Sequence, residues 1–523
     1  MLRITDLKNP IIIFLIAFLG VMVYANSVSG DFIWDDKILV QYNDIITSIE
    51  NLPVIFTKNI TYGTDDVSNF YRPVQMLSYL MNYGLARLDV RAYHVTNIAL
   101  HILTAVSLFL FIFLICRNRF IAAAASLLFV CHPLNTEAVA YISGRADLLV
   151  ALFTLFVLVF YAEYAGTGNR SFYLTAFLFY AISLMSKETA LVTPFLLAAF
   201  IYIYGNKKMF WRNSVPFFAA ALIYIILRKT VLDFSSGALT VSMPLLERVL
   251  VIFDSLGKYF IKLVYPADLH MQYALILPGP VDISVILGIF LTLVMAWGAI
   301  AARKTERIVT FAIAWFFITY LPVSNVFPLN ATFAEHWFYV PSMGIFMIAG
   351  WFLGKLCAGN KILKWSLSLF FVIVLGVFSY LTILQNNYWK DAEKFYKRTL
   401  EYARGAGRAR IYFSLSIVYF EKGLTDEGIW ALERAIKDKP DYVDARNNLA
   451  TAFIMKGEYD KAIEQAEMSL GINPSSATAY YRLSVAYFHK KNYILARQSL
   501  EKAKRLGYRR VRPGYERALE RLK

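Results

Sequence analysis

The sequence predicts an all-α integral membrane protein in two parts, a bundle of about eleven membrane-spanning helices followed by a stack of helical repeats. The composition is the first reason: 58% of the 523 residues are hydrophobic and 17% are charged, whereas about 25% are charged in a soluble domain. The second reason is a change along the chain. Apolar runs fill residues 1–387, and residues 388–523 are charged and repeat every 34 residues. We therefore expect a domain boundary near residue 387.

The membrane part is predicted from apolar runs of spanning length, some of them short. These runs lie at residues 11–28, 95–116, 120–138, 147–164, 171–186, 190–205, 214–228, 282–301, 307–322, 341–357 and 365–384. The first run is expected to be a retained membrane helix, because no convincing small-residue cleavage site follows it. Segment 246–265 carries five charged residues among its apolar ones. It is expected to form an amphipathic helix at the membrane interface.

Positive charges in the short loops predict the orientation of the bundle. They occupy alternate loops, at Arg117, Arg119, Arg170, Lys207, Lys208, Arg212, Arg303, Lys304, Arg307, Lys361 and Lys364. These loops are expected to be cytoplasmic, together with Arg3 and Lys8. The remaining loops and the repeats then face outward. Because the net charge of +16 includes many such loop residues, no nucleic-acid partner is expected, and the lipid bilayer is the expected environment.

The outward loops contain polar motifs that gather at one face of the membrane. Asp35 and Asp36 follow the first span directly, within a long loop at residues 29–94 that also carries Arg72. Other ionisable residues in these loops are His132, Glu137, Arg145, Asp147, Lys187, Glu188, Glu335 and His336. Any one of these polar residues has a simpler explanation. Thr136 and Ser143 are expected to cap helices, and Lys187 could neutralise Glu188. Their collection on one face favours a site for a charged ligand.

The C-terminal part repeats with tetratricopeptide spacing. Three copies align at Gly423, Gly457 and Lys491 and at Leu415, Leu449 and Leu483. Pro440 and Pro474 are also 34 residues apart. Each unit of this kind is a pair of antiparallel helices that buries its apolar faces by stacking. We expect three units at about 409–509, preceded by a joining helix at 388–407. The three cysteines show neither a disulfide framework nor a metal-ligand spacing.

Over most of its length the chain resembles the transmembrane and tetratricopeptide-repeat-containing O-mannosyltransferases. The resemblance rests on motifs at Asp31–Asp36, Tyr71-Arg72-Pro73, His132-Pro133 with Thr136–Val139, Gly144–Asp147, Ser186-Lys187-Glu188 and Glu335–Ser342. It implies the C-type glycosyltransferase fold, a polyprenyl-phosphate-linked sugar as donor, and transfer to a Ser or Thr hydroxyl of an exported protein on the non-cytoplasmic face. The sugar implied is a mannose-like hexose.

Two features of the sequence depart from that family. His336 stands where the family usually has Arg, which puts a phosphate contact there in doubt. Eukaryotic members carry more than the three repeats expected here, so the chain looks like a prokaryotic relative. A bacterial inner membrane is the expected location, with the active site and the repeats on the periplasmic face.

The chemistry of such a transfer assigns roles to the motif residues. Phosphate is a good leaving group, so the step needs a base for the acceptor hydroxyl's proton, and a single displacement inverts the anomeric centre. By motif match Asp35 is the expected base, and Asp36 would orient it, raise its pKa or bind a metal. The residues expected to bind the donor phosphate are the cationic ones, Arg72, Arg145, Lys187 and His336. Supporting or sugar-binding roles are expected for His132, Glu137, Asp147, Glu188 and Glu335.

Some alternatives remain open from the sequence. No cofactor or metal is predicted, although some C-type glycosyltransferases use a divalent ion. The acceptor could be a glycan or lipid, the membrane part could be a non-catalytic anchor for the repeats, or the same charges could serve a transporter of lipid-linked substrates. The concave repeat surface is expected to hold the acceptor, a partner or a second copy, through Tyr412, Asn447, Asn448, Tyr480 and Tyr481.

Overall fold

The computed structural model describes residues 10–63, 68–230, 243–273, 277–327, 329, 331–358, 361–509 and 511–521. Arg3 and Lys8, which entered the topology prediction, lie outside these residues. Every regular element in the described part of the chain is helical, which confirms the all-α prediction. The chain divides into two compact units, Met1–Asp391 and Ala392–Lys523.

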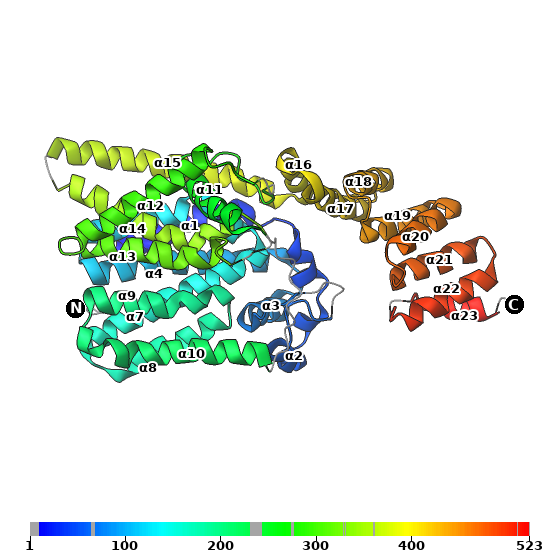
Figure 1. Ribbon diagram of the computed structural model, residues 1–523, viewed down its shortest axis with the longest axis horizontal. Coiled ribbons are helices and arrows are strands. Elements are labelled where there is room, and N and C mark those ends of the chain that lie inside the picture. The colour runs from blue at the N-terminus through cyan, green and yellow to red at the C-terminus, as the bar shows by residue number, and fades with distance from the viewer. Residues whose placement is uncertain are drawn as a thin grey trace. The chain divides into compact units, whose positions relative to one another are not determined.

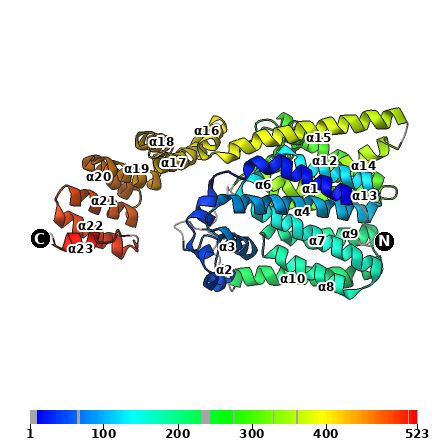
Figure 2. The same ribbon diagram turned by 180° about the vertical axis from the view of Figure 1, so that it is seen from behind.

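The first unit is a bundle of long helices (Figure 1). They are α1 (Pro10–Tyr24), α4 (Val90–Cys116), α5 (Arg119–Cys131), α7 (Arg145–Thr167), α8 (Arg170–Leu184), α9 (Thr193–Tyr204), α10 (Phe210–Thr230), α11 (Leu245–Val264), α12 (Ile283–Ala302), α13 (Arg307–Tyr320), α14 (Tyr339–Leu356) and α15 (Lys361–Lys390). Figure 2 shows α1 between α4 and α15, both of which it contacts. Aromatic side chains such as Phe111, Trp315 and Tyr339 fill the centre of the bundle and are fully buried.

The helices confirm an integral membrane protein. Among the described residues, seven segments are long and apolar enough to cross a membrane: Pro10–Ser27, Val90–Cys116, Ile142–Thr167, Lys207–Thr230, Ile283–Ala302, Glu335–Leu356 and Lys361–Lys390. An eighth is added if Arg119–Cys131 and Pro133–Ala140, bent by 56° relative to each other, count as one span. Shorter apolar helices lie at Arg170–Leu184, Glu188–Tyr204 and Arg307–Val323. The count of eleven spans stays a prediction, as does the interfacial position of α11.

Helix α11 packs directly on α12 at two glycines. A methyl group on Gly257 would collide with the carbonyl oxygen of Ser284, and one on Gly288 would collide with that of Phe253. The two backbones therefore touch with no side chain between them, which is how small residues let membrane helices approach closely.

The described residues of the long loop 29–94 form an ordered cap at one end of the bundle. It contains α2 (Leu52–Thr57) and α3 (Pro73–Ala86), which lie together at that end in Figure 1. Leu39, Ile46 and Tyr79 of this loop form a small buried core of their own, which also includes Ile142 from the start of the third span. The loop is thereby fixed to the bundle.

The second unit consists of α16 (Ala392–Tyr402) and three antiparallel helix pairs, followed by α23 (Tyr515–Arg521). The pairs are α17 (Gly405–Glu421) with α18 (Thr425–Asp438), α19 (Val443–Lys456) with α20 (Tyr459–Ile472), and α21 (Ala477–His489) with α22 (Tyr493–Arg505). Gly423, Gly457 and Lys491 follow the first helix of each pair, and all three have positive φ, at 75°, 77° and 60°. The 34-residue recurrence thus reflects one left-handed turn that each repeat requires.

Candidate functional site

The two adjacent aspartates lie in different environments. Asp36 is 1% exposed, and its Oδ1 accepts hydrogen bonds from the Ser143 backbone N–H at 2.7 Å and the Ser143 hydroxyl at 2.5 Å. Its Oδ2 accepts one from the Ile33 N–H at 3.2 Å. Burial raises the pKa of Asp36 to about 7, although these hydrogen bonds favour the charged form and lower it. Asp36 therefore ties the loop to η7 (Ile142–Gly144).

Asp35, by contrast, is partly exposed. Its backbone N–H donates to the hydroxyl of Tyr141 at 3.3 Å. The preceding residue, Trp34, has φ of 56°, a left-handed conformation that costs a bulky residue about 1–2 kcal/mol. Strain of this kind persists only where surrounding contacts hold it, and it gathers at functional sites. The partly exposed carboxyl of the pair thus follows a strained residue.

A second cluster consists of two ion pairs. Arg72 donates from Nε to Glu188 Oε2 at 3.1 Å and from Nη2 to Oε1 at 2.6 Å, a bidentate geometry. Lys187 Nζ donates to Asp147 Oδ1 at 2.6 Å, with both side chains nearly buried. Lys187 and Glu188 therefore pair with partners from α7 and from the loop 29–94 rather than with each other. The two cations and two carboxylates balance in charge.

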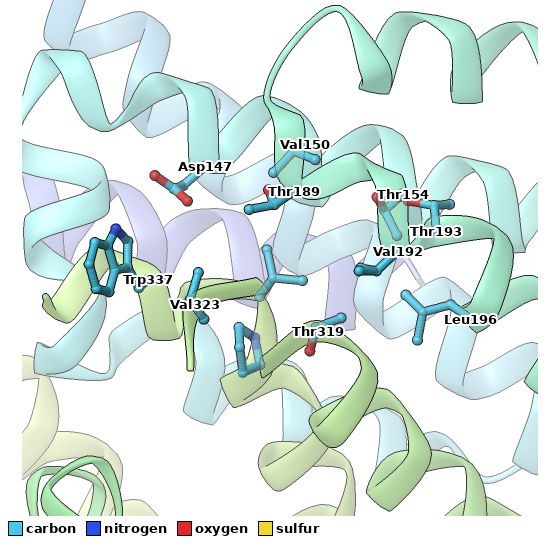
Figure 3. Close-up of a pocket in the computed structure, with 12 residues that line it drawn as sticks. Asp147, Val150, Thr154, Thr189, Val192, Thr193, Leu196, Thr319, Val323 and Trp337 are labelled. Carbon is cyan, nitrogen blue, oxygen red and sulfur yellow. Dashed lines mark hydrogen bonds between the residues drawn. The ribbon is translucent and has the colours of Figure 1, made fainter. Parts of the chain in front are cut away.

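A pocket opens beside Asp147. It is narrow, with a cavity volume of about 20 Å³, and lies partly open to solvent between α7, α9, α13 and the start of α14. Figure 3 shows Asp147 and Trp337 at one end and Leu196 and Thr193 at the other. Among the described residues that line it, Asp147 is the one charged side chain, and it is paired with Lys187; most of the other lining side chains are apolar or threonine.

A third cluster fixes the turn that carries Trp337, η11 (Glu335–Phe338). Glu137 Oε2 accepts from the His336 backbone N–H at 2.8 Å, and its Oε1 lies 2.9 Å from His336 Nδ1. Glu335 Oε1 accepts from the His270 N–H at 2.7 Å and from the Tyr273 hydroxyl at 2.6 Å. Both carboxylates are buried. They position η11 and, through it, one wall of the pocket.

Arg145 is fully buried, and its guanidinium binds other groups of the protein. Its Nε donates to Asn97 Oδ1 at 2.7 Å, its Nη1 to Asn82 Oδ1 at 2.7 Å, and its Nη2 to the Tyr93 carbonyl at 2.9 Å. The guanidinium also stacks on Tyr79, 4.7 Å from the ring centroid. It joins α3, α4 and α7. The phosphate-binding role predicted for Arg145 stays a prediction, and this burial argues against it.

His132 is also buried. Its Nδ1 accepts from the Leu134 N–H at 3.2 Å, and its Nε2 lies 3.0 Å from the Leu263 carbonyl oxygen. Nδ1 therefore caps the short turn Pro133–Asn135, and Nε2 joins the end of α5 to the end of α11. A sugar contact for His132 stays a prediction that this arrangement does not favour.

The structure also shows contacts that the sequence did not indicate. Ser143 was expected to cap a helix, but it binds Asp36 instead. Tyr141 had no expected role, and no sequence signal marks it, because its contact with Asp35 depends on the fold. Among the described residues, no group of three or more His, Cys, Asp and Glu side chains could hold a metal ion.

The repeat surface differs from the expectation in its details. Tyr412, Asn447 and Tyr481 are buried. Asn447 donates to Ser476 and accepts from Ser469, and Tyr481 stacks on Tyr508. Because a side chain that lines a groove must be exposed, these three residues do not line one. Their internal contacts stabilise the repeats instead. Asn448 and Tyr480 are partly exposed and remain candidates for a binding surface.

Comparison with known proteins bears on both units. Tetratricopeptide repeat models match residues 414–477 and 477–506. A protein O-mannosyl-transferase of Caenorhabditis elegans is 26% identical over 453 residues, which is 81% of this chain and 62% of that protein. Over most of its length the chain is similar to proteins named protein O-mannosyl-transferases. The human homologues TMTC1 and TMTC3 are 24% and 23% identical, over 84% and 95% of this chain and 56% and 60% of their own lengths. The chain thus spans about 60% of the length of these relatives.

Proposed function

We propose that the chain is an inverting membrane glycosyltransferase. It moves a mannose-like hexose from a polyprenyl-phosphate donor to a Ser or Thr hydroxyl of an exported protein. The observation that carries this proposal is the partly exposed Asp35 beside the strained Trp34, in the same loop whose Arg72 pairs with Glu188 near the pocket. The names of the homologues support the reaction class.

Asp35 acts as the general base in this proposal. Its carboxylate takes the proton of the acceptor hydroxyl while the hydroxyl oxygen attacks the anomeric carbon. The bond between that carbon and the phosphate oxygen breaks, and polyprenyl phosphate leaves with the electron pair. Because the attack comes from the face opposite the leaving group, the anomeric configuration inverts. Asp36 keeps the loop in place through Ser143.

The phosphate binds at the two ion pairs beside the pocket. Arg72 and Lys187 stabilise it there, since cations at the phosphate oxygens favour departure of the leaving group. Glu188 and Asp147 orient these two cations. His336, oriented by Glu137, is the further phosphate ligand. The first units of the polyprenyl chain enter beside Val150, Val192 and Leu196, and the narrow pocket between these side chains widens to receive them.

The reaction takes place on the outer face of the membrane, which is the periplasmic face of a bacterial inner membrane in this proposal. The repeats face the same compartment and present an acceptor segment or a partner protein through a surface that includes Asn448 and Tyr480. Their 34-residue units match tetratricopeptide models, and stacked helical repeats of this type form extended concave binding surfaces.

Glycoproteomics of exported proteins tests the proposal. Asp35→Asn should abolish Ser- and Thr-linked hexose, because asparagine cannot accept the proton. Asp44→Asn, an exposed carboxylate of the same loop, is the matched control and should leave the glycopeptides unchanged. Unchanged glycopeptides with Asp35→Asn would reject protein O-glycosylation. A non-catalytic scaffold predicts that outcome, and a transporter predicts movement of lipid-linked substrate in proteoliposomes without product.

A further inference from the structure

The last helix of the first unit changes character along its length. In the first part of α15, side chains such as Trp365 and Phe370 are exposed, as expected for a helix in lipid. Thr382, Asn386 and Trp389 in its last turns are buried. Their spacing places them on one face of the helix, so the end of α15 is built to make polar and aromatic contacts inside the protein.

Polar side chains anchor the end of α15 to three different segments. Thr382 donates to the Cys131 carbonyl at 2.7 Å, Gln385 to the Leu269 carbonyl at 3.1 Å, and Asn386 to the Val23 carbonyl at 2.9 Å. Buried amide and hydroxyl groups satisfied in this way fix the position of a helix strongly, because breaking each bond leaves a buried polar group unpaired.

From this fixed end, two contacts reach the loop of the acid pair. The Lys390 carbonyl accepts a hydrogen bond from the Asp31 N–H at 3.1 Å. The Trp389 ring packs on the Tyr141 ring, with 5.5 Å between the centroids, and the Tyr141 hydroxyl accepts from the Asp35 N–H at 3.3 Å. Trp389, Tyr141 and Asp35 therefore form a continuous chain of contacts.

We infer that Tyr141 and Trp389 are positioning residues for Asp35, so that the end of α15 belongs to the catalytic machinery. This inference rests on the proposed function. The strained Trp34 would relax to an ordinary conformation unless its neighbours were held, and the relaxation would move the Asp35 carboxylate. Tyr141 holds the Asp35 backbone from one side, and Trp389 fixes the Tyr141 ring from the other.

The test is the steady-state kinetics of sugar transfer by the purified full-length protein, using a synthetic polyprenyl-phosphate hexose and a Ser/Thr peptide. Tyr141→Phe removes one oxygen and keeps the ring contact with Trp389. It should lower kcat about tenfold to a hundredfold, as expected for a misplaced catalytic group, while KM for the donor changes less than twofold. Trp389→Leu should do the same, and Trp389→Phe should restore most of kcat, because it keeps an aromatic ring against Tyr141.

Controls separate positioning from a general loss of structure. Trp365→Leu changes an exposed tryptophan on the same helix and should leave kcat unchanged. If Trp389→Leu fails to fold, Tyr141→Phe alone decides the question. A Tyr141→Phe variant with wild-type kcat would overturn the inference. The inference would also fail if the lower kcat came with a higher KM and a lower unfolding midpoint, because those changes indicate general structural damage. If Asp35→Asn is inactive and Tyr141→Phe transfers sugar at the normal rate, only this inference is rejected. If Asp35→Asn still transfers sugar, the proposed function is rejected.

Discussion

Asp36 and Ser143 are joined by two hydrogen bonds that converge on a single carboxylate oxygen, one from the backbone N–H and one from the hydroxyl of the serine. The contact links residues 107 positions apart in the sequence and fixes the loop 29–94 to η7, directly before α7. Asp36 thereby stabilises the fold. Its neighbour, Asp35, is left at the partly exposed position where a base can meet a substrate.

The hydroxyl of Ser143 should stabilise the protein in a pH-dependent way. The pKa of Asp36 is about 7 in the folded protein and lies near its usual value of about 4 in the unfolded chain. The contribution of Asp36 to stability is therefore complete below about pH 4 and is lost as the pH rises through 7. Ser143→Ala removes a hydrogen bond that favours the charged form, so it should raise this pKa and enlarge that loss.

We expect Ser143→Ala to destabilise the protein by about 1.5–3 kcal/mol at pH 8.5, where Asp36 is charged, and by about 0.5–1.5 kcal/mol at pH 5. Thermal unfolding in detergent at both pH values measures the difference. Ser126→Ala is the control, because the buried Ser126 hydroxyl has no hydrogen-bond partner among the described residues. An equal effect of Ser143→Ala at the two pH values would argue against this role for Asp36.

The Arg72–Glu188 pair should be coupled far more strongly than an exposed pair. Glu188→Gln leaves a largely buried guanidinium without its bidentate partner, and we expect a loss of about 1–3 kcal/mol, the cost of unpaired buried donors. The double variant with Arg72→Gln should lose less than the sum of the single variants. Asp89→Asn breaks the exposed Arg91–Asp89 pair while keeping a helix-capping side chain, and it should leave the unfolding midpoint nearly unchanged. Additive effects at Arg72 and Glu188 would contradict the pairing.

The contact between α11 and α12 should tolerate no side chain at Gly288. Gly288→Ala places a methyl group against the Phe253 carbonyl, which must separate the helices, and we expect a loss of about 1–3 kcal/mol or more. Gly298→Ala on the same helix is the matched control, since its methyl group would lie 3.6 Å from Ile313 Cδ1, an ordinary contact. Unfolding midpoints of the two variants should differ clearly. Similar midpoints would mean that the helices are less closely packed than described.

The backbone at Lys491 should be strained, and replacing this residue with glycine should relieve the strain in the last repeat. It occupies the left-handed position that Gly423 and Gly457 fill in the preceding repeats. Lys491→Gly should stabilise the α21–α22 pair by about 0.5–1 kcal/mol, visible as slower hydrogen exchange of residues 477–505 in the full-length protein. Gly457→Ala should have the opposite effect on α19 and α20. Faster exchange in Lys491→Gly would refute the idea that this position needs glycine.

Local patterns in the sequence predicted the fold well. The apolar runs correspond to apolar helices, and the recurrence of Gly423, Gly457 and Lys491 follows from a turn that each repeat makes. These features depend on residues close together in the chain. The number of spans that cross the bilayer could not be settled in this way, because several apolar helices, such as Arg170–Leu184, are shorter than a span requires.

The candidate site was less accessible to sequence reasoning. The motifs mark where charged groups occur, but burial decides what each one does. Arg145 and His132 lie in conspicuous motifs, yet both are enclosed by hydrogen bonds from the protein. Tyr141 carries no signal at all, because its contact with Asp35 arises only when segments 106 residues apart meet.

Transfer of hexose by purified Asp35→Asn tests the central claim most directly. With a polyprenyl-phosphate hexose donor and a Ser/Thr peptide, the wild-type protein should form glycopeptide, and Asp35→Asn should slow the transfer by about 10²–10⁴-fold while donor binding is retained. Transfer at the wild-type rate by Asp35→Asn would contradict the account, because the proton of the acceptor would then have another destination.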